Sequence, residues 1–126
     1  MDPSSHPVAH RWRHYRTVRG HSPTHAFISG LPLADRLAVL TAMDAVRQSG
    51  LEAARHLDGE IYEVRAFAAR RSFRILFSQE GRRGQVLLSL HVFAKTTQKT
   101  PRHDIDLAHQ RLRDWRARGE GRRSHQ

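Results

Sequence analysis

The stretches IYEVRAF at residues 61–67 and SFRILFS at residues 72–78 decide the fold. In both, apolar side chains alternate with polar ones, a period of two that is typical of a half-buried β-strand. Glu63 and Arg65 share one face of the first stretch. The opposite face is apolar: Tyr62, Val64 and Ala66. The short link at residues 68–71 favours an antiparallel pair.

A third strand is predicted over residues 85–93, which are apolar on both faces except for Ser89 and His91. Such a run is expected of a central strand. It follows the turn-like GRRG at residues 81–84, so the three strands form an antiparallel meander. The composition of Trp12–Val18 also favours a short strand, which we place at an edge.

Helix signals flank the sheet. Ser22-Pro23 starts one helix that stops at Gly30, and Leu31-Pro32 starts another that stops at Gly50. The second helix carries an apolar stripe that we expect to be buried: Leu33, Leu37, Leu40 and Val46. Thr100-Pro101 starts a C-terminal helix closed by Gly119. Its apolar face consists of Ile105, Ala108, Leu112 and Trp115.

These elements predict an α+β domain in which an N-terminal helical hairpin and a C-terminal helix pack on one face of a three- to four-stranded antiparallel sheet. The 126 residues suffice for one such domain. We divide the chain into a His/Arg-rich segment (residues 1–21), the domain (22–118) and a basic tail (119–126). The chain has no cysteine, which excludes disulfides, thiolate zinc sites and cysteine nucleophiles. Without an apolar run that spans a bilayer, we expect a cytoplasmic protein with no membrane partner.

The net charge of +10 is concentrated in residues 61–103, which hold nine Lys or Arg and two acids. A basic field of this kind attracts phosphate backbones. The other explanation of the basic residues is that they only keep the protein soluble. The N-terminal histidines at i, i+4 spacing, His10/His14 and His21/His25, have the spacing of metal ligands on a helix. No carboxylate or cysteine completes a site beside them, so we predict no metal site.

The polar strand face predicts a catalytic surface. It presents Glu63, Arg65, Arg74 and His91, and a segment with Lys95 and Lys99 leads from it to a helix N-terminus. Cations there suit a phosphodiester. RNA supplies its own nucleophile, the 2′-hydroxyl, so cleavage needs only positioning, charge stabilisation and a base.

The sequence leaves the base open among Glu63, His91 and a lysine. It also leaves open a purely structural ion pair of Glu63 with Arg65 and Arg74, and a histidine at position 91 that belongs to the edge of the core. We expect further RNA contacts from Arg70, Arg71 and Arg102.

From Ser22 to about Arg116 the chain resembles the phage-derived branch of the HigB toxins, within the RelE/ParE superfamily. The resemblance lies in LDGEIYEVR at residues 57–65, FRILF at residues 73–77 and LSLHVFAKTTQKTP at residues 88–101. It implies a RelE-like fold. The family's site positions fall on Arg65, Arg74, Lys95 and Lys99, with Glu63 beside them. Thr96 stands where the family pattern has a second lysine.

The resemblance further implies the toxin of a type II toxin–antitoxin pair, a metal-independent endoribonuclease that cleaves messenger RNA at the ribosome without a cofactor. It implies a helix-turn-helix antitoxin of the HigA kind as partner, with operator DNA bound through the complex. The alternative is a non-catalytic toxin or module that binds ribosome, RNA or DNA gyrase, because the related ParE toxins resemble inhibitors of gyrase.

Overall fold

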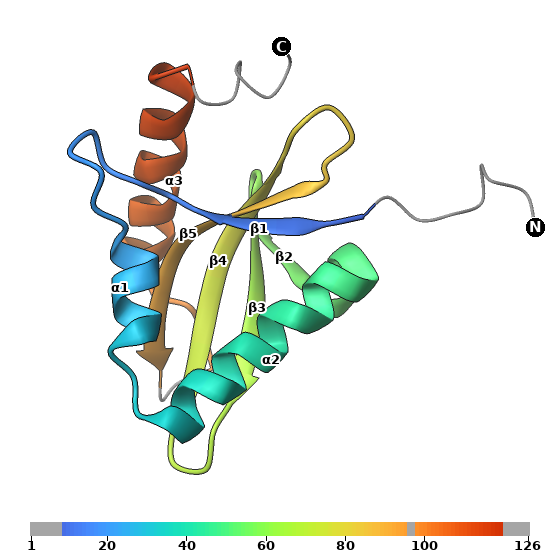
Figure 1. Ribbon diagram of the computed structural model, residues 1–126, viewed down its shortest axis with the longest axis vertical. Helices are drawn as coiled ribbons and strands as arrows, with labels where there is room; N and C mark the ends of the chain where they lie inside the picture. The colour runs from blue at the N-terminus through green and yellow to red at the C-terminus, as the bar shows by residue number, and fades with distance from the viewer. Residues whose placement is uncertain (1–8, 96–97, 120–126) are drawn as a thin grey trace, which may run out of the picture.

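The computed structural model describes residues 9–95 and 98–119. Its centre is a five-stranded sheet in the order β1-β5-β4-β3-β2 (Figure 1). The strands are β1 Arg11–His14, β2 Arg55–Asp58, β3 Ile61–Phe67, β4 Ser72–Glu80 and β5 Val86–Lys95. The helices are α1 Pro23–Ser29, α2 Leu33–Ser49 and α3 Arg102–Ala117, with a short 3-10 helix at Gly50–Ala53. None of these helices in the described part of the chain is long and apolar enough to cross a membrane.

The strands β2 to β5 form the predicted antiparallel meander, which confirms the α+β class. β1 lies at the edge, as predicted, and pairs with β5 in parallel from Arg11 opposite Val86 to His14 opposite Ser89. It is shorter than predicted and ends at His14; the chain turns back later, at Gly20, whose positive φ of 86° favours glycine. β2 was missed because its four residues, RHLD, are mostly polar.

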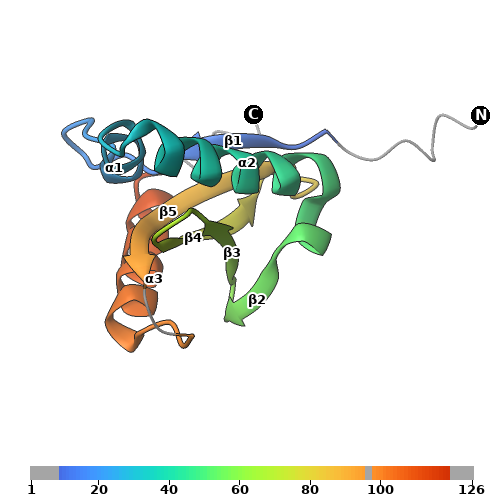
Figure 2. The same ribbon diagram turned by 90° about the horizontal axis from the view of Figure 1, so that it is seen from below.

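The helices lie on both faces of the sheet, so the prediction of a single covered face is wrong. Figure 2 shows α1 and α2 on one side and α3 on the other. The first core joins α2 to the apolar face of β3 and β4, including Val64 and Phe73. The second core joins α3 to an apolar half of the opposite face, which consists of Ile61, Leu76, Leu88 and Leu90. This second apolar half-face is the reason that α3 packs there.

The predicted helix ends are confirmed, but the predicted stripe of α2 is confirmed only at Val46 and is wrong for its three leucines. The Ser22 hydroxyl accepts a hydrogen bond from the backbone N–H of His25 at 3.3 Å and caps α1. On α2 the buried residues are Val39, Met43 and Val46. Three leucines expected in the core are instead exposed: Leu33 (62%), Leu37 (53%) and Leu40 (45%). The helix therefore turns an apolar stripe toward solvent.

Candidate functional site

The predicted site residues of the strands, Glu63, Arg65, Arg74 and His91, lie on the face of the sheet that α3 half covers. Arg65 on β3 stands directly opposite Arg74 on β4, and Arg74 stands opposite Phe93 on β5. Strand alternation puts Glu63 on the same face as Arg65. The sheet therefore brings Glu63 and both arginines together, as the sequence predicted.

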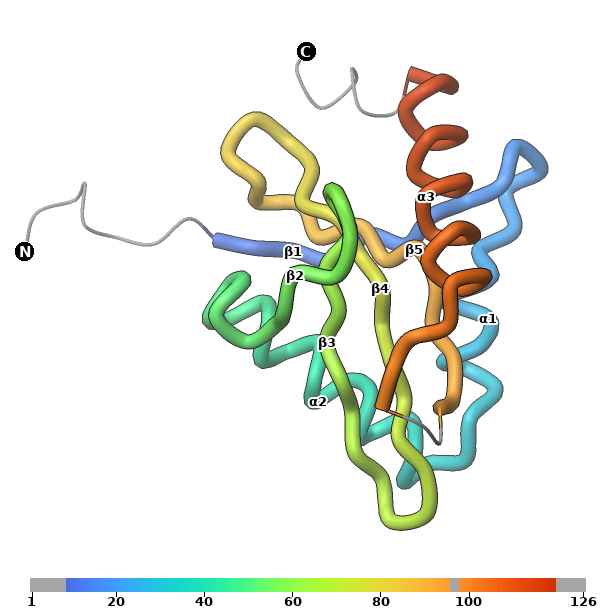
Figure 3. Tube along the Cα trace, turned by 180° about the vertical axis from the view of Figure 1, so that it is seen from behind, coloured from blue at the N-terminus to red at the C-terminus, as the bar shows by residue number. Residues whose placement is uncertain are grey.

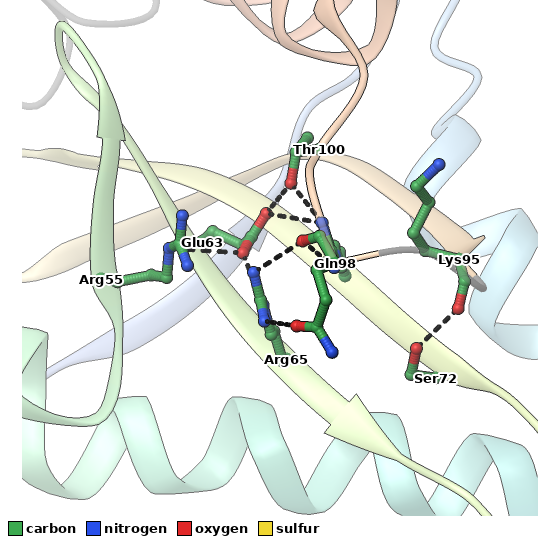
Figure 4. Close-up of polar contacts among 8 residues, drawn as sticks. Arg55, Glu63, Arg65, Ser72, Lys95, Gln98 and Thr100 are labelled. Carbon is green, nitrogen blue, oxygen red and sulfur yellow. Dashed lines mark hydrogen bonds and ion pairs between the residues drawn. The ribbon is translucent and has the colours of Figure 1, made fainter.

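Both arginines hold the segment that leads into α3. Arg65 Nη2 donates to the backbone oxygen of Gln98 at 3.0 Å, and Arg65 Nη1 lies 3.3 Å from the side-chain oxygen of the same residue. Arg74 Nη2 donates to that backbone oxygen as well. Figure 3 shows this segment passing over β4 before α3 begins, and Figure 4 shows the contacts.

A carboxylate and a hydroxyl complete the cluster. Glu63 Oε1 accepts from Arg65 Nε at 3.0 Å. The Thr100 hydroxyl accepts from Arg74 Nη1 at 2.7 Å and donates to Glu63 Oε2 (Figure 4). We call these five residues the arginine clamp: Glu63, Arg65, Arg74, Gln98 and Thr100.

Burial corrects the prediction of an exposed cationic surface. The exposed fraction is 0% for Glu63 and 2% for Arg74, because Gln98 and Thr100 cover them. Burial lowers the pKa of Arg74, an effect that Glu63 opposes, and arginine stays charged at any physiological pH. Both oxygens of this buried carboxylate are already bound, an arrangement that disfavours Glu63 as the base. The structural ion pair, the other possibility that the sequence left open, describes these contacts.

His91 lies farther along β5 on the same face and pairs with Asp104 in the first turn of α3. The distance between His91 Nε2 and Asp104 Oδ1 is 2.7 Å. The two side chains are 15% and 11% exposed, and the His91 ring stacks on Phe93 at 4.8 Å. Desolvation lowers the pKa of His91, and Asp104 opposes that effect.

This pair has the arrangement of a general base. A lowered pKa leaves His91 neutral at pH 7, and a carboxylate can only accept, so the proton sits on Nε2 and Nδ1 carries the lone pair. A carboxylate that fixes the tautomer and orientation of an imidazole is the recurring support of a histidine base. Of the three candidates for the base, His91 has the fitting geometry.

The predicted lysines lie at the end of β5 and in the segment that the arginines hold. Lys95 is half-buried at the end of β5 and lies to one side of the clamp contacts (Figure 4). Lys99 is exposed and belongs to the segment that the arginines hold. Thr96, the position where the family pattern has a lysine, lies outside the described residues.

The predicted RNA contacts fall on different sides of the molecule. Arg102 is exposed at the start of α3 and bonds to Asp106 at 3.0 Å. Arg70 is exposed in the turn between β3 and β4. Arg71 donates to Asp35 of α2 at 2.9 Å, on the opposite side of the sheet from the clamp. Arg71 therefore lies apart from the clamp, and its contact with RNA stays a prediction.

Several residues of this site were not predicted. Thr100 was interpreted as a helix cap, but α3 begins after Pro101 without a side-chain cap, and the hydroxyl serves the clamp. Arg55 of β2 lies 3.6 Å from Glu63 Oε1, in a strand that has no clear pattern. Asp104 carries no signal in the sequence, because its partner His91 belongs to another element.

One family model, described as Phage derived protein Gp49-like (DUF891), matches residues 26–113. No curated protein was found to match the chain. The matched range runs from α1 into α3 and includes the clamp and the His91–Asp104 pair, whereas β1 lies before it.

Proposed function

The chain belongs to the Gp49-like family of phage-derived proteins, which groups broadly with the HigB-like toxins of the RelE/ParE superfamily, and we propose that it is the toxin of a type II toxin–antitoxin pair. Its activity is the cleavage of messenger RNA at the ribosome, in the cytoplasm and without a cofactor. The observation that carries this proposal is the His91–Asp104 pair, which lies on the same sheet face as the clamp.

In the proposed reaction, His91 Nδ1 takes the proton of a ribose 2′-hydroxyl, and the oxygen attacks the adjacent phosphorus. The P–O5′ bond breaks, and the leaving 5′-oxygen takes a proton from an ammonium of Lys95 or Lys99. These cations also stabilise the charge that develops on the phosphate oxygens. Arg65 and Arg74 act as positioning residues, because they hold the segment that carries Lys99 and leads to Asp104.

The test compares two histidines that have the same kind of partner. His109 Nε2 lies 2.7 Å from Asp58 Oδ2, a pair matched in distance to that of His91. Purified variants are added to a translating extract, and primer extension maps the cuts in a reporter message. We expect His91→Gln to lose about 10²- to 10⁴-fold of the cleavage rate, and His109→Gln to cut like the wild type. Intact messages with the wild-type protein would refute the nuclease.

We further propose the partner to be a helix-turn-helix antitoxin, through which the complex binds operator DNA. Leu37 of α2 and the exposed Phe67 (75%) line one hollow together with several alanines of α2 and of the turn after β3. A contiguous exposed apolar surface supports a protein partner. Co-expression with the product of the adjacent reading frame should yield a stable complex that relieves toxicity. A toxin that remains alone on gel filtration contradicts this partner.

A second candidate is a toxin that binds its target without cleavage, on the ribosome or on DNA gyrase. The observation that favours it is the burial of Arg74, because a guanidinium inside the clamp is not available to a phosphate. After induction, this candidate gives growth arrest or DNA damage with intact messages, whereas the nuclease gives cut messages.

A further inference from the structure

A hollow of about 730 Å³ lies where β1 meets α1. The described residues that line it include five basic residues and no acidic one: Arg13, His14, Arg16, His21 and His25. All five precede residue 26, so they lie outside the range that the family model matches. The basic residues of the hollow therefore come from the part of the chain before the matched range, whereas Ala26, which also lines it, lies inside that range.

The floor of the hollow is fixed by buried hydrogen bonds. His14 Nδ1 lies 2.6 Å from the hydroxyl of Ser89 and 3.2 Å from that of Thr24, and these two hydroxyls are 2.9 Å apart. Ser89 and Thr24 are almost fully buried. The bonds join β1, α1 and β5, so the position of the floor is set by three elements of the fold.

The positive charge inside the hollow comes from Arg16, with two histidines exposed beside it, and Arg13 adds a charge at the edge that β1 forms. Burial lowers the pKa of His14, and the charges of His25 and Arg16 lower it further, so His14 is neutral at pH 7. Arg16 is exposed, and His21 and His25 are exposed as well. The guanidinium of Arg13 lies 5.0 Å from the ring centre of Trp115 on α3, so it points to the α3 face of the sheet, at the edge where β1 joins that face to the hollow.

This chemistry suits a phosphate ester and does not suit a metal ion. The described residues contain no group of three His, Cys, Asp or Glu placed to hold a metal. Guanidinium groups match phosphate oxygens in charge and geometry. The volume falls within the range of about 300–1,000 Å³ that is common for ligand sites, and exposed histidine rings can stack on unpaired bases of RNA.

We propose that this hollow binds the phosphate backbone of a single RNA strand, as a second contact separate from the His91–Asp104 pair. The two sites lie on opposite faces of the sheet, because Ser89 contacts α1 whereas His91 contacts α3. A strand that occupies both sites passes around the edge that β1 forms. The choice of RNA as ligand rests on the proposed function, whereas the basic hollow itself does not.

The test measures the binding of a fluorescent single-stranded RNA of twelve nucleotides without ribosomes. We expect the double variant Arg13→Gln/Arg16→Gln to bind about tenfold more weakly than wild type, which corresponds to about 1.4 kcal/mol. The slope of log affinity against log salt should fall by about 1.4, since each phosphate contact to a single strand contributes about 0.7. The control is Arg83→Gln/Arg113→Gln, two exposed positions away from the hollow with the same loss of charge.

A second variant, His21→Gln/His25→Gln, keeps the test valid if loss of the Arg13 contact with Trp115 unfolds the protein, and thermal melting monitors both variants. Weaker binding than the control supports the proposal. Equal affinities in the hollow variants and the control overturn it, and so does a wild-type protein that binds no RNA. Inorganic phosphate is a separate probe: if it binds at the hollow and the RNA does not, the assignment to RNA is overturned.

The two proposals fail separately. His91→Gln should bind the RNA as tightly as wild type and leave messages intact in the translating extract. If the wild-type protein binds RNA but does not cut messages, the proposed nuclease activity is contradicted and the proposed RNA contact at the hollow is not. If the wild-type protein cuts messages and Arg13→Gln/Arg16→Gln binds RNA as tightly as wild type, only the proposed RNA contact at the hollow is contradicted.

Discussion

Arg65 and Arg74 face each other across β3 and β4 and donate to the same atom, the backbone oxygen of Gln98. Like charges that are directly opposite in a sheet repel each other. Glu63 offsets that repulsion, with Oε1 3.0 Å from Arg65 Nε and Oε2 3.9 Å from Arg74 Nη1. The clamp thus uses two cations to fix the chain that connects β5 to α3.

The first prediction concerns the carboxylate of the clamp. Glu63→Gln leaves two adjacent guanidinium groups without their counter-charge, and Arg74 is buried. Breaking a buried ion pair costs about 3–5 kcal/mol, so we expect a loss of this size in the free energy of unfolding in urea. Glu60→Gln is the control, because Glu60 forms an exposed pair with Arg116, and surface pairs contribute about 0–1 kcal/mol. Equal losses for both variants would contradict the clamp.

The second prediction concerns the hydroxyl of Thr100. Thr100→Val keeps the shape of the side chain but removes the group that joins Arg74 to Glu63. Leaving buried polar partners unsatisfied costs about 1–3 kcal/mol. We expect that loss in urea unfolding, and Thr100→Ser should restore most of it. A valine variant as stable as wild type would show that the hydroxyl contributes nothing.

The third prediction concerns stability at acid pH. Burial lowers the pKa of His91 and of His14 in the folded protein, below the value of about 6.5 expected in the unfolded chain. Between these values the unfolded state binds more protons, so the stability is full above pH 6.5 and falls as the pH drops toward the folded pKa. Urea midpoints should show this decline from pH 7 to 5.5, and His91→Gln should reduce it. A flat profile in the wild type would refute the prediction.

The fourth prediction tests whether Asp104 orients His91 for cleavage or only stabilises the fold. Asp104 raises the pKa of His91 against the effect of burial, so Asp104→Asn should move the acid limb of the cleavage profile to lower pH. It should also reduce the cleavage rate, since the imidazole loses its fixed tautomer. A lower rate with an unmoved limb would mean that Asp104 only supports the fold.

The fifth prediction tests the two faces of α2. Leu37→Ala removes an exposed side chain, and surface changes of this kind are usually within about 0.5 kcal/mol. Met43→Ala removes a side chain that is 4% exposed, and such core truncations cost about 2–5 kcal/mol. Urea unfolding of both variants provides the comparison, and a larger loss for Leu37→Ala would place the leucines in the core after all.

The sequence was sufficient for features that depend on local pattern. Alternation in residues 61–67 assigned Val64 to a core and Arg65 to the opposite face, and both assignments are confirmed. The helix stripe failed because Leu37 and Val39 belong to two apolar stripes of one helix, and only packing against the sheet selects between them. The prediction that all helices cover one face of the sheet failed for a similar reason, since periodicity does not show on which face α3 packs.

The site was less predictable because its contacts join distant parts of the chain. Alternation alone places Arg74 on a polar face, where solvent is the default neighbour. Its burial depends on Gln98 and Thr100, which fold back over β4. The pairing of His91 with Asp104 likewise requires the path of the chain between β5 and α3.

The parallel pairing of β1 with β5 has a consequence for how the chain is made. Residues 11–14 leave the ribosome early, yet their partners at residues 86–89 come from the last third of the molecule. The edge of β5 therefore closes late in folding, and contacts that are so distant in sequence slow the search for the native state. A nascent chain that stops before β5 would lack both His91 and the strand that joins β1 to the rest of the sheet.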